Sequence, residues 1–202
     1  MTVDRAERQL DATRREAAKC RNCDLWRLGT QTVFGEGPVP ASLMLVGEQP
    51  GDREDIAGRP FVGPAGGLLD DALREARIER ANAYLTNIVK HFKWRHEGGK
   101  RRIHDKPNRT EVRAGLPWFH AELELVRPKV LVCLGATAAQ APLGPDFRIS
   151  EEHGVPVPAP NLAPVVLATT HPSAVLRAGE RRGEVYVRLI ADLRVASSAL
   201  NG

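Results

Sequence analysis

The sequence lacks the features of a membrane-spanning or secreted protein. No apolar run approaches the roughly 20 residues that a membrane span requires, and the charged stretch 1–8 has no signal-peptide core. Three cysteines are too few for a disulfide framework in a chain of 202 residues. We therefore expect a cytoplasmic protein without a membrane partner. In such a compartment the pair Cys20-Arg-Asn-Cys23 suggests a metal, a cluster or a redox site.

Internal repeats and low-complexity segments are absent too. The stretch 47–52 matches neither a phosphate-binding Walker loop nor a dinucleotide-binding fingerprint, which gives little support to a nucleotide cofactor. With 42% hydrophobic and 27% charged residues, the composition is that of a soluble globular protein. The length suits one domain with a sizeable core, so we predict a single domain over residues 1–202 and expect a monomer.

Four short apolar runs predict buried strands, near residues 42–46, 83–89, 129–134 and 165–170. Helical patterns lie around them, at 3–19, about 68–76, about 110–125 with Thr110 as N-cap, from 135 onward, and about 181–199. Alternating strands and helices predict a parallel sheet covered on both faces. The expected fold class is therefore α/β, a three-layer α/β/α domain around a central four-stranded parallel sheet.

Three of these four strands end in chemically versatile residues. The first runs into Gly47-Glu48-Gln49-Pro50-Gly51-Asp52, the second reaches Asn87, and the fourth runs into His171-Pro172-Ser173. Because the carboxyl ends of parallel strands share one edge, we expect these groups to converge. The glycine-rich stretch 58–67 adds Phe61 from a turn flanked by prolines.

The stretch 93–110 carries the positive charge of the chain. It contains seven Lys or Arg and two acids, a formal charge of +5, whereas the whole chain is +4. Gly98-Gly99 and Pro107 predict a loop here rather than a helix. A basic loop that holds His104 suits a polyanion, since Lys and Arg release counterions from phosphates. The alternative is a solvated loop whose charge only aids solubility.

Together these groups suit an enzyme that acts on a nucleic-acid base. An amide such as Asn87 can read a base edge and Phe61 can stack on a base, while a histidine or a carboxylate can stabilise charge at the reacting atoms. Each residue also has a structural interpretation: Asn87 as a turn cap, His171 as a satisfied buried histidine, Phe61 as core. The agreement of three strand ends favours the functional interpretation.

Four motifs resemble those of the iron–sulfur uracil-DNA glycosylases, the family 4-like branch. They are Gly47-Glu-Gln-Pro-Gly51, Gly58-Arg-Pro-Phe-Val-Gly-Pro-Ala-Gly66, Thr86-Asn-Ile-Val-Lys90 and His171-Pro-Ser173. A fifth, Lys100-Arg-Arg-Ile-His104, resembles the hallmark insertion of one subgroup, uracil-DNA glycosylase X. The motifs occur in the family's order, and the resemblance extends from Cys20 to about Leu193.

The resemblance implies that uracil is excised from DNA and that a loop histidine then bonds covalently to C1′ of the abasic sugar, in a single turnover. By position it implies His104 as the nucleophile, Glu48 as its assistant, and His171 as the group that stabilises the departing uracil. The expected substrate-binding set is Gly47, Gln49, Asp52, Phe61, Asn87 and Ser173, and the expected DNA-binding set is Lys100, Arg101 and Arg102. The expected partner is uracil-containing DNA, in single strands because no base need then be unpaired.

The resemblance further implies a [4Fe–4S] cluster on Cys20, Cys23 and His91, but the position of the usual fourth ligand is Gly115. Clusters normally have four protein ligands, and Cys133 lies within a predicted strand. A solvent or other ligand, a three-iron cluster, or weak occupancy would each account for the missing ligand, as would the unsupported substitute His120. A zinc ion on the same three residues is a further alternative.

Two other functions compete with the covalent enzyme. One is an ordinary water-using, multiple-turnover glycosylase of the same fold, in which His104 merely contacts DNA. The other is a non-catalytic nucleic-acid-binding protein, or a redox module that uses the cysteine pair. The stretch 100–104 favours the covalent enzyme over the first, and the combination of Glu48, Asn87 and His171 disfavours the second.

Overall fold

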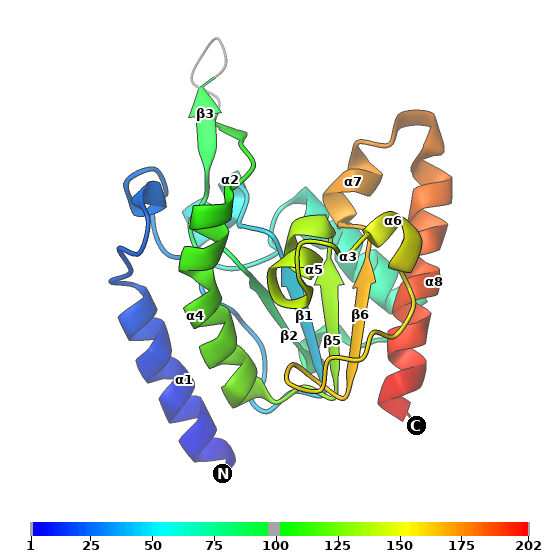
Figure 1. Ribbon diagram of the computed structural model, residues 1–202, viewed down its shortest axis with the longest axis horizontal. Coiled ribbons are helices and arrows are strands. Elements are labelled where there is room, and N and C mark those ends of the chain that lie inside the picture. The colour runs from blue at the N-terminus through cyan, green and yellow to red at the C-terminus, as the bar shows by residue number, and fades with distance from the viewer. Residues whose placement is uncertain (1, 97–101, 202) are drawn as a thin grey trace.

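A four-stranded parallel sheet forms the centre of the molecule (Figure 1). The computed structural model describes residues 2–96 and 102–201. The strands are β1 (Leu43–Gly47), β2 (Ala83–Asn87), β5 (Val130–Leu134) and β6 (Val165–Thr169), in the order β2-β1-β5-β6. The predicted sheet is confirmed, with strand ends that differ by one or two residues.

Helices cover both faces of the sheet (Figure 1). They are α1 (Val3–Ala17), α2 (Asp52–Ala57), α3 (Pro64–Glu75), α4 (Arg109–Val126), α5 (Ala136–Leu143), α6 (Ile149–Glu152), α7 (Pro172–Leu176) and α8 (Arg182–Asn201), with short 3-10 turns η1 (Asp24–Arg27), η2 (Arg80–Asn82) and η3 (Gly179–Arg181). Helices α1, α4 and α5 pack on one face, and α3, α7 and α8 pack on the other. The three-layer α/β/α fold class is therefore confirmed. Among the described residues, no helix is both long enough and apolar enough to cross a membrane.

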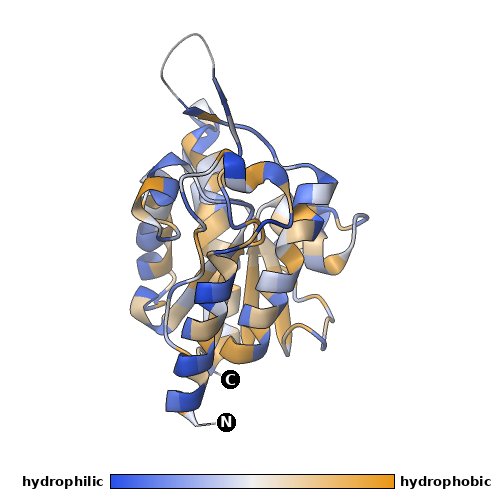
Figure 2. Ribbon diagram, turned by 90° about the vertical axis from the view of Figure 1, so that its left-hand side faces the viewer, coloured by the Kyte–Doolittle hydropathy of each residue, from blue (hydrophilic) through white to orange (hydrophobic). Residues whose placement is uncertain are grey.

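The apolar runs of the strands are continuous because both faces of the sheet are buried. Every residue of β1, β2 and β5 is buried. Along β1, Met44 and Val46 contact the layer of α1 and α4, whereas Leu43 and Leu45 contact that of α3 and α8. Figure 2 shows the same division, with hydrophobic residues on the strands and inner helix faces and hydrophilic residues outside. Because successive side chains of a strand point to opposite faces of the sheet, each strand contributes apolar side chains to both core layers.

The order of the strands creates a crevice at one edge of the sheet. Strand β1 lies between β2 and β5, so the chain crosses from one side of β1 to the other after β2. Ligands of open α/β sheets bind at such a switch point, outside the carboxyl ends of the strands. The site is therefore expected where β1 and β5 end.

Helix α4 begins at Arg109 with Asn108 as its N-cap, so the prediction of Thr110 as N-cap is wrong. The Asn108 side-chain oxygen accepts a hydrogen bond from Glu111 N (2.9 Å), and the Glu111 carboxylate accepts one from Asn108 N (2.6 Å). This reciprocal capping box needs a glutamate three residues after the cap. Asn108 has that glutamate, whereas Thr110 does not.

The flanks of the basic stretch form a hairpin rather than the loop that the sequence predicts. β3 (Trp94–His96) pairs in antiparallel fashion with β4 (Arg102–His104), and Trp94 lies opposite His104. The hairpin stands above the carboxyl edge of the sheet (Figure 1). Gly98, Gly99, Lys100 and Arg101 lie outside the described residues.

A buried ion pair joins α4 to the end of β2. Lys90 Nζ donates to Glu122 Oε2 (2.5 Å), to Thr86 Oγ1 (2.7 Å) and to the carbonyl of Asn87 (2.6 Å). The side chains of Lys90 and Glu122 are 1% and 0% exposed, so neither charge has water to solvate it. Tyr84 donates its hydroxyl to Glu122 Oε1 (3.1 Å). The pair thus holds the turn that carries Asn87.

We expect Glu122→Leu to lower the free energy of unfolding by about 3–5 kcal/mol, because it leaves Lys90 as an uncompensated buried charge. Urea unfolding measures the loss. The double variant Lys90→Met/Glu122→Leu removes both charges and is expected to recover most of the stability. A single variant as stable as the wild type would show that the pair contributes nothing.

Candidate active site

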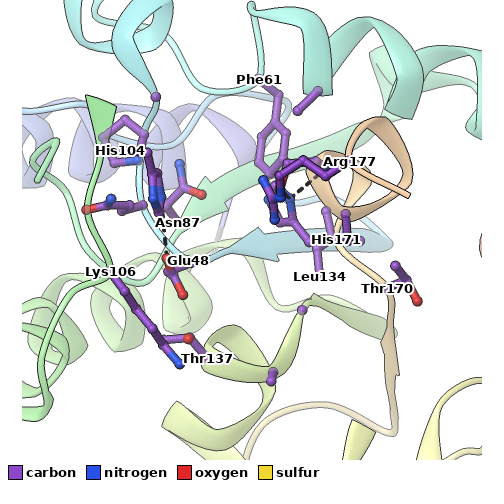
Figure 3. A pocket seen from close by; sticks show the side chains of 18 of the residues that line it. Glu48, Phe61, Asn87, His104, Lys106, Leu134, Thr137, Thr170, His171 and Arg177 are labelled. Atoms are coloured by element: carbon purple, nitrogen blue, oxygen red, sulfur yellow. Dashed lines mark hydrogen bonds and ion pairs between the residues drawn. The ribbon is translucent and has the colours of Figure 1, made fainter. Parts of the chain in front are cut away.

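A cavity of about 790 Å³ opens at the carboxyl edge of the sheet (Figure 3). Residues from the ends of β1, β2, β5 and β6 line it, together with the hairpin and α7. Of the residues predicted for the site, those that line it are Glu48, Gln49, Phe61, Asn87, His104, His171 and Ser173. Segments far apart in the sequence therefore meet at one place, as expected from the shared edge of parallel strands.

Glu48 and His104 both line the cavity and lie next to each other, joined by a dashed line in Figure 3. His104 Nε2 lies 3.5 Å from Glu48 Oε1, and the imidazole is 51% exposed. Loss of water on its protein side lowers the pKa of His104, Glu48 raises it, and Arg177 lowers it further, with a net decrease. The imidazole is thereby kept neutral: its Nε2 faces the Glu48 carboxylate, and a neutral ring has one nitrogen with a lone pair, which a nucleophile requires.

Asn87 and Phe61 form the inner wall. Asn87 is 3% exposed, and its Oδ1 would lie 2.3 Å from a Cβ at Gly47. The same Cβ would lie 2.9 Å from Phe61 Cζ. Gly47, predicted as a substrate-binding residue, does not line the cavity, but only a glycine there lets the amide and the ring approach β1 this closely.

His171 caps the short helix α7 and is held in one tautomer. Its Nδ1 accepts a hydrogen bond from Ser173 N (3.1 Å) and lies 2.8 Å from Ser173 Oγ. Because Nδ1 is an acceptor, the ring proton is on Nε2. Burial lowers the pKa of His171 to about 4, and the positive charge of Arg177 acts in the same direction, as does His104 when it is protonated. The Phe61 ring stacks near it, with centroids 6.2 Å apart. The site thus contains a neutral Nε2–H donor beside an aromatic face.

Gln49 lines the cavity, but both polar atoms of its side chain form hydrogen bonds to the base of the hairpin. Its Nε2 donates to the carbonyls of Asp105 (2.9 Å) and Lys93 (3.3 Å), and its Oε1 accepts from Lys93 N (3.0 Å). The sequence predicts Gln49 as a substrate-binding residue. The structure shows it fastening the segment that carries His104.

The side chain of Arg102 is likewise engaged by partners within the protein. Its guanidinium donates to Asp52 Oδ1 and to Asp55 Oδ2, both at 2.6 Å, and stacks over Phe92 and Trp94. Asp52 does not line the cavity. The predicted roles of Arg102 in DNA binding and Asp52 in substrate binding stay predictions, but in this structure both side chains anchor β4 to α2.

Two cations at the cavity were missed by sequence reasoning, Lys106 and Arg177. Lys106 extends past Glu48 toward Thr137, and Arg177 lies over His171 (Figure 3). Lys106 belongs to the basic stretch, and Arg177 follows His171-Pro-Ser173 by one helical turn. A search for basic residues within one turn of each strand-end motif would have found Arg177, whereas Lys106 follows His104 by two residues.

The candidate metal ligands lie beside α4. Cys20 is buried, and its Sγ accepts from Trp118 Nε1 (3.1 Å). Burial raises the pKa of Cys23, and the nearby Cys20 raises it further, against the lowering effect of a backbone hydrogen bond at Leu25. Two thiols in one another's field can act as a ligand pair once deprotonated.

The protonation state of His91 also suits a metal ligand. Thr32 Oγ1 donates to the carbonyl of Ala17 (3.1 Å), so it accepts from His91 Nε2–H (2.9 Å), which leaves the lone pair on Nδ1. Burial and Arg21 lower the pKa of His91 to about 4, against the weaker effect of Asp55, so it is neutral.

A fourth ligand is missing at Gly115. A Cβ there would lie 2.2 Å from the carbonyl of Ile88, so the backbone packs too closely for a cysteine. Within residues 2–96 and 102–201, no three His, Cys, Asp or Glu side chains are grouped to hold a single metal ion. An iron–sulfur cluster and a zinc ion on Cys20, Cys23 and His91 both stay predictions, and the cluster would have one protein ligand fewer than usual.

Comparison with known proteins identifies the family. The profile of the Uracil DNA glycosylase superfamily matches residues 34–194. A "Type-4 uracil-DNA glycosylase" of Thermotoga maritima is 34% identical over 95% of this chain and 95% of its own length. Proteins of the same name are 35% identical in Pyrobaculum aerophilum, over 82% of this chain and 83% of that protein, and 40% identical in Archaeoglobus fulgidus, over 65% and 62%. Because the match covers most of the chain and includes every strand that forms the cavity, the chain belongs to the uracil DNA glycosylase superfamily.

Proposed function

We propose that this protein is a uracil-DNA glycosylase: it excises uracil from DNA, and its His104 then bonds covalently to the abasic sugar. The observation that carries the proposal is the meeting of Glu48, Asn87 and His171 in one cavity, with the neutral imidazole of His104 at its mouth. The names of the relatives support the base-removing activity. The short distance between His104 and Glu48 supports the covalent step.

The buried wall of the cavity would recognise uracil. The Asn87 amide supplies a donor and an acceptor for a pyrimidine edge, and Phe61 offers a stacking face. Gly47 keeps Phe61 and Asn87 close enough to act on one base. Because Asn87 is only 3% exposed, a base reaches its amide when it is flipped or unpaired rather than stacked in a duplex.

Two charges develop in the transition state of bond cleavage, and one residue of the cavity would stabilise each of them. The C1′–N1 bond breaks, its electron pair leaves with uracil, and the sugar becomes oxocarbenium-like. The Nε2–H of His171 would donate to the developing uracil anion, and the Glu48 carboxylate would stabilise the cationic sugar. The Nε2–H of His171 is in place before the bond breaks, so His171 needs no prior proton transfer.

His104 would then capture the sugar. The lone pair of its neutral imidazole forms the new bond to C1′, and the resulting imidazolium loses its remaining ring proton to Glu48 or to solvent. A nucleophile already in place reacts before water can diffuse in. The product is a protein–DNA adduct, and each molecule reacts once. If water took this place instead, the protein would be an ordinary multiple-turnover glycosylase.

Release of free uracil from a labelled oligonucleotide tests the glycosylase proposal. The wild type is expected to release uracil from single-stranded DNA, and a thymine oligonucleotide of the same sequence is the control. A duplex arm tests the predicted single-strand preference. No uracil released from either form would contradict the proposal. The monomeric state and the cytoplasmic location stay predictions.

For the cofactor, we propose that Cys20, Cys23 and His91 hold an iron–sulfur cluster. When bound it would tie the N-terminal segment to α4, and no step of base removal uses it. Iron and acid-labile sulfide in anaerobically purified protein measure its presence, and Cys20→Ser is expected to lower both. Equal iron and sulfide in the wild type and the variant would contradict this assignment.

The tautomer of His171 gives a pH prediction. Because its pKa is about 4, we expect His171 to remain the neutral Nε2–H form from pH 8 to pH 5 and to protonate only as the pH approaches about 4. Nitrogen-15 NMR of the imidazole reads the tautomer directly, and His171→Gln identifies the signal by its loss. Titration near the ordinary value of 6.5 would contradict the assigned role.

A further inference from the structure

Glu54 is a buried carboxylate that also lines the cavity, and neither the motifs nor the proposed chemistry uses it. It lies on α2 and is 8% exposed. Its Oε2 accepts a hydrogen bond from Gly51 N (3.1 Å), and its Oε1 accepts one from Gly63 N (2.7 Å). One carboxylate therefore joins two loops that are separate in the sequence.

These two loops carry the groups on either side of the base-binding space. Gly51 ends the turn that follows β1 and presents Glu48, whereas Gly63 follows Phe61 by two residues. The fit around the carboxylate is close: a Cβ at Gly51 would lie 2.7 Å from Oε2, and one at Gly63 would lie 3.0 Å from Oε1. No other residue at either position would allow both backbone N–H groups to approach unshifted.

The loop of Phe61 needs such a constraint because its backbone is strained. Phe61 has a φ of 55°, in the left-handed region that bulky residues avoid. Such conformations persist when their surroundings hold them, and they occur often at functional sites. Arg80, which is paired with Asp70, donates to the Phe61 carbonyl (3.3 Å). Glu54 holds the same turn from the other end, at Gly63.

We propose that Glu54 is a positioning residue that sets the distance between the Glu48 turn and the Phe61 loop, and so the width of the space for uracil. The proposal rests on the proposed function. Both carboxylate oxygens are engaged by backbone N–H groups, so Glu54 acts through Phe61 and Glu48 rather than on the base. The competing explanations are that its negative charge matters by itself, or that it only stabilises the fold.

Three variants separate these explanations. Glu54→Gln keeps the size but leaves one acceptor for two N–H groups. Glu54→Asp keeps the charge but is one methylene shorter, so it cannot reach both loops. Leu10→Ala removes a buried side chain of α1, away from the cavity, and is the control for a loss of stability alone.

The experiment measures single-turnover uracil release, inhibition by free uracil, and hydrogen exchange at Gly51 N and Gly63 N, in the full-length protein. For Glu54→Gln and Glu54→Asp we expect release slowed by about 10²-fold, the cost of a misplacement near 1 Å. We also expect weaker inhibition by uracil and faster exchange at one or both amides. Leu10→Ala is expected to unfold at lower urea and to keep all three properties.

Two outcomes would overturn the proposal. Glu54→Asp with wild-type release and inhibition would assign the effect to charge, and release that falls equally in Leu10→Ala would assign it to stability. If the wild type itself releases no uracil, the proposed function fails separately. Exchange at the two amides and calorimetric binding of free uracil then decide whether Glu54 sets the loops.

Discussion

Replacing His104 by Ser is expected to abolish the covalent complex with DNA while uracil release continues. The imidazole supplies the lone pair that captures the sugar, whereas Glu48 and His171, which act on the bond that breaks, are unchanged. A serine hydroxyl is a poor nucleophile at neutral pH without a positioned base. Water then enters the vacated volume, completes the reaction, and frees the enzyme to act again.

The measurement is a denaturing gel of the variant with labelled uracil-containing single-stranded DNA, followed by alkali to cleave abasic sites. His96→Ser is the matched control, since His96 belongs to the same hairpin but packs edge-to-face with Trp94 and does not line the cavity. The control is expected to retain the adduct. A heat-resistant adduct in His104→Ser would show that another residue bonds to the sugar.

Glu48→Gln is expected to slow uracil release by about 10²–10⁴-fold, the usual contribution of a positioned acid or base. The amide keeps the size of the side chain but loses the negative charge that faces the cationic sugar and His104 Nε2, 3.5 Å away. Adduct formation falls with release because the sugar cation must form before it can be captured. Single-turnover kinetics measures both.

Urea unfolding of the same variant separates chemistry from folding, and we expect a midpoint close to that of the wild type. Glu36→Gln is the control, because Glu36 is an exposed carboxylate whose partner is Arg59, outside the cavity. Its release rate is expected to match the wild type. Full activity in Glu48→Gln would show that the Glu48 carboxylate does not stabilise the sugar cation.

The sheet was predictable from the sequence because its strands are buried on both faces. Runs such as Leu43–Gly47 and Val130–Leu134 are apolar throughout, and strands alternate with helices, so class and layers followed. Convergence of Glu48, Asn87 and His171 followed from the same argument. These predictions depend only on local pattern and on the geometry of parallel strands.

The contacts that hold the hairpin were not predictable in the same way. Gln49 and Arg102 occur in motifs that suggest ligand contact, yet both are satisfied by partners 44 to 56 residues away in the chain. Which partner a polar side chain finds depends on tertiary distances that spacing does not encode. For the same reason the sequence alone does not predict the role of Glu54, which depends on where Gly51 and Gly63 lie in space.

The most direct test of the account is a denaturing gel of the wild-type protein mixed with labelled uracil-containing single-stranded DNA, beside a thymine control. We expect a shifted band that survives heat and detergent and forms only with uracil, in an amount that never exceeds the protein added. Alkali-labile cleavage in excess of the protein, without a shifted band, would contradict the covalent step and indicate a multiple-turnover glycosylase.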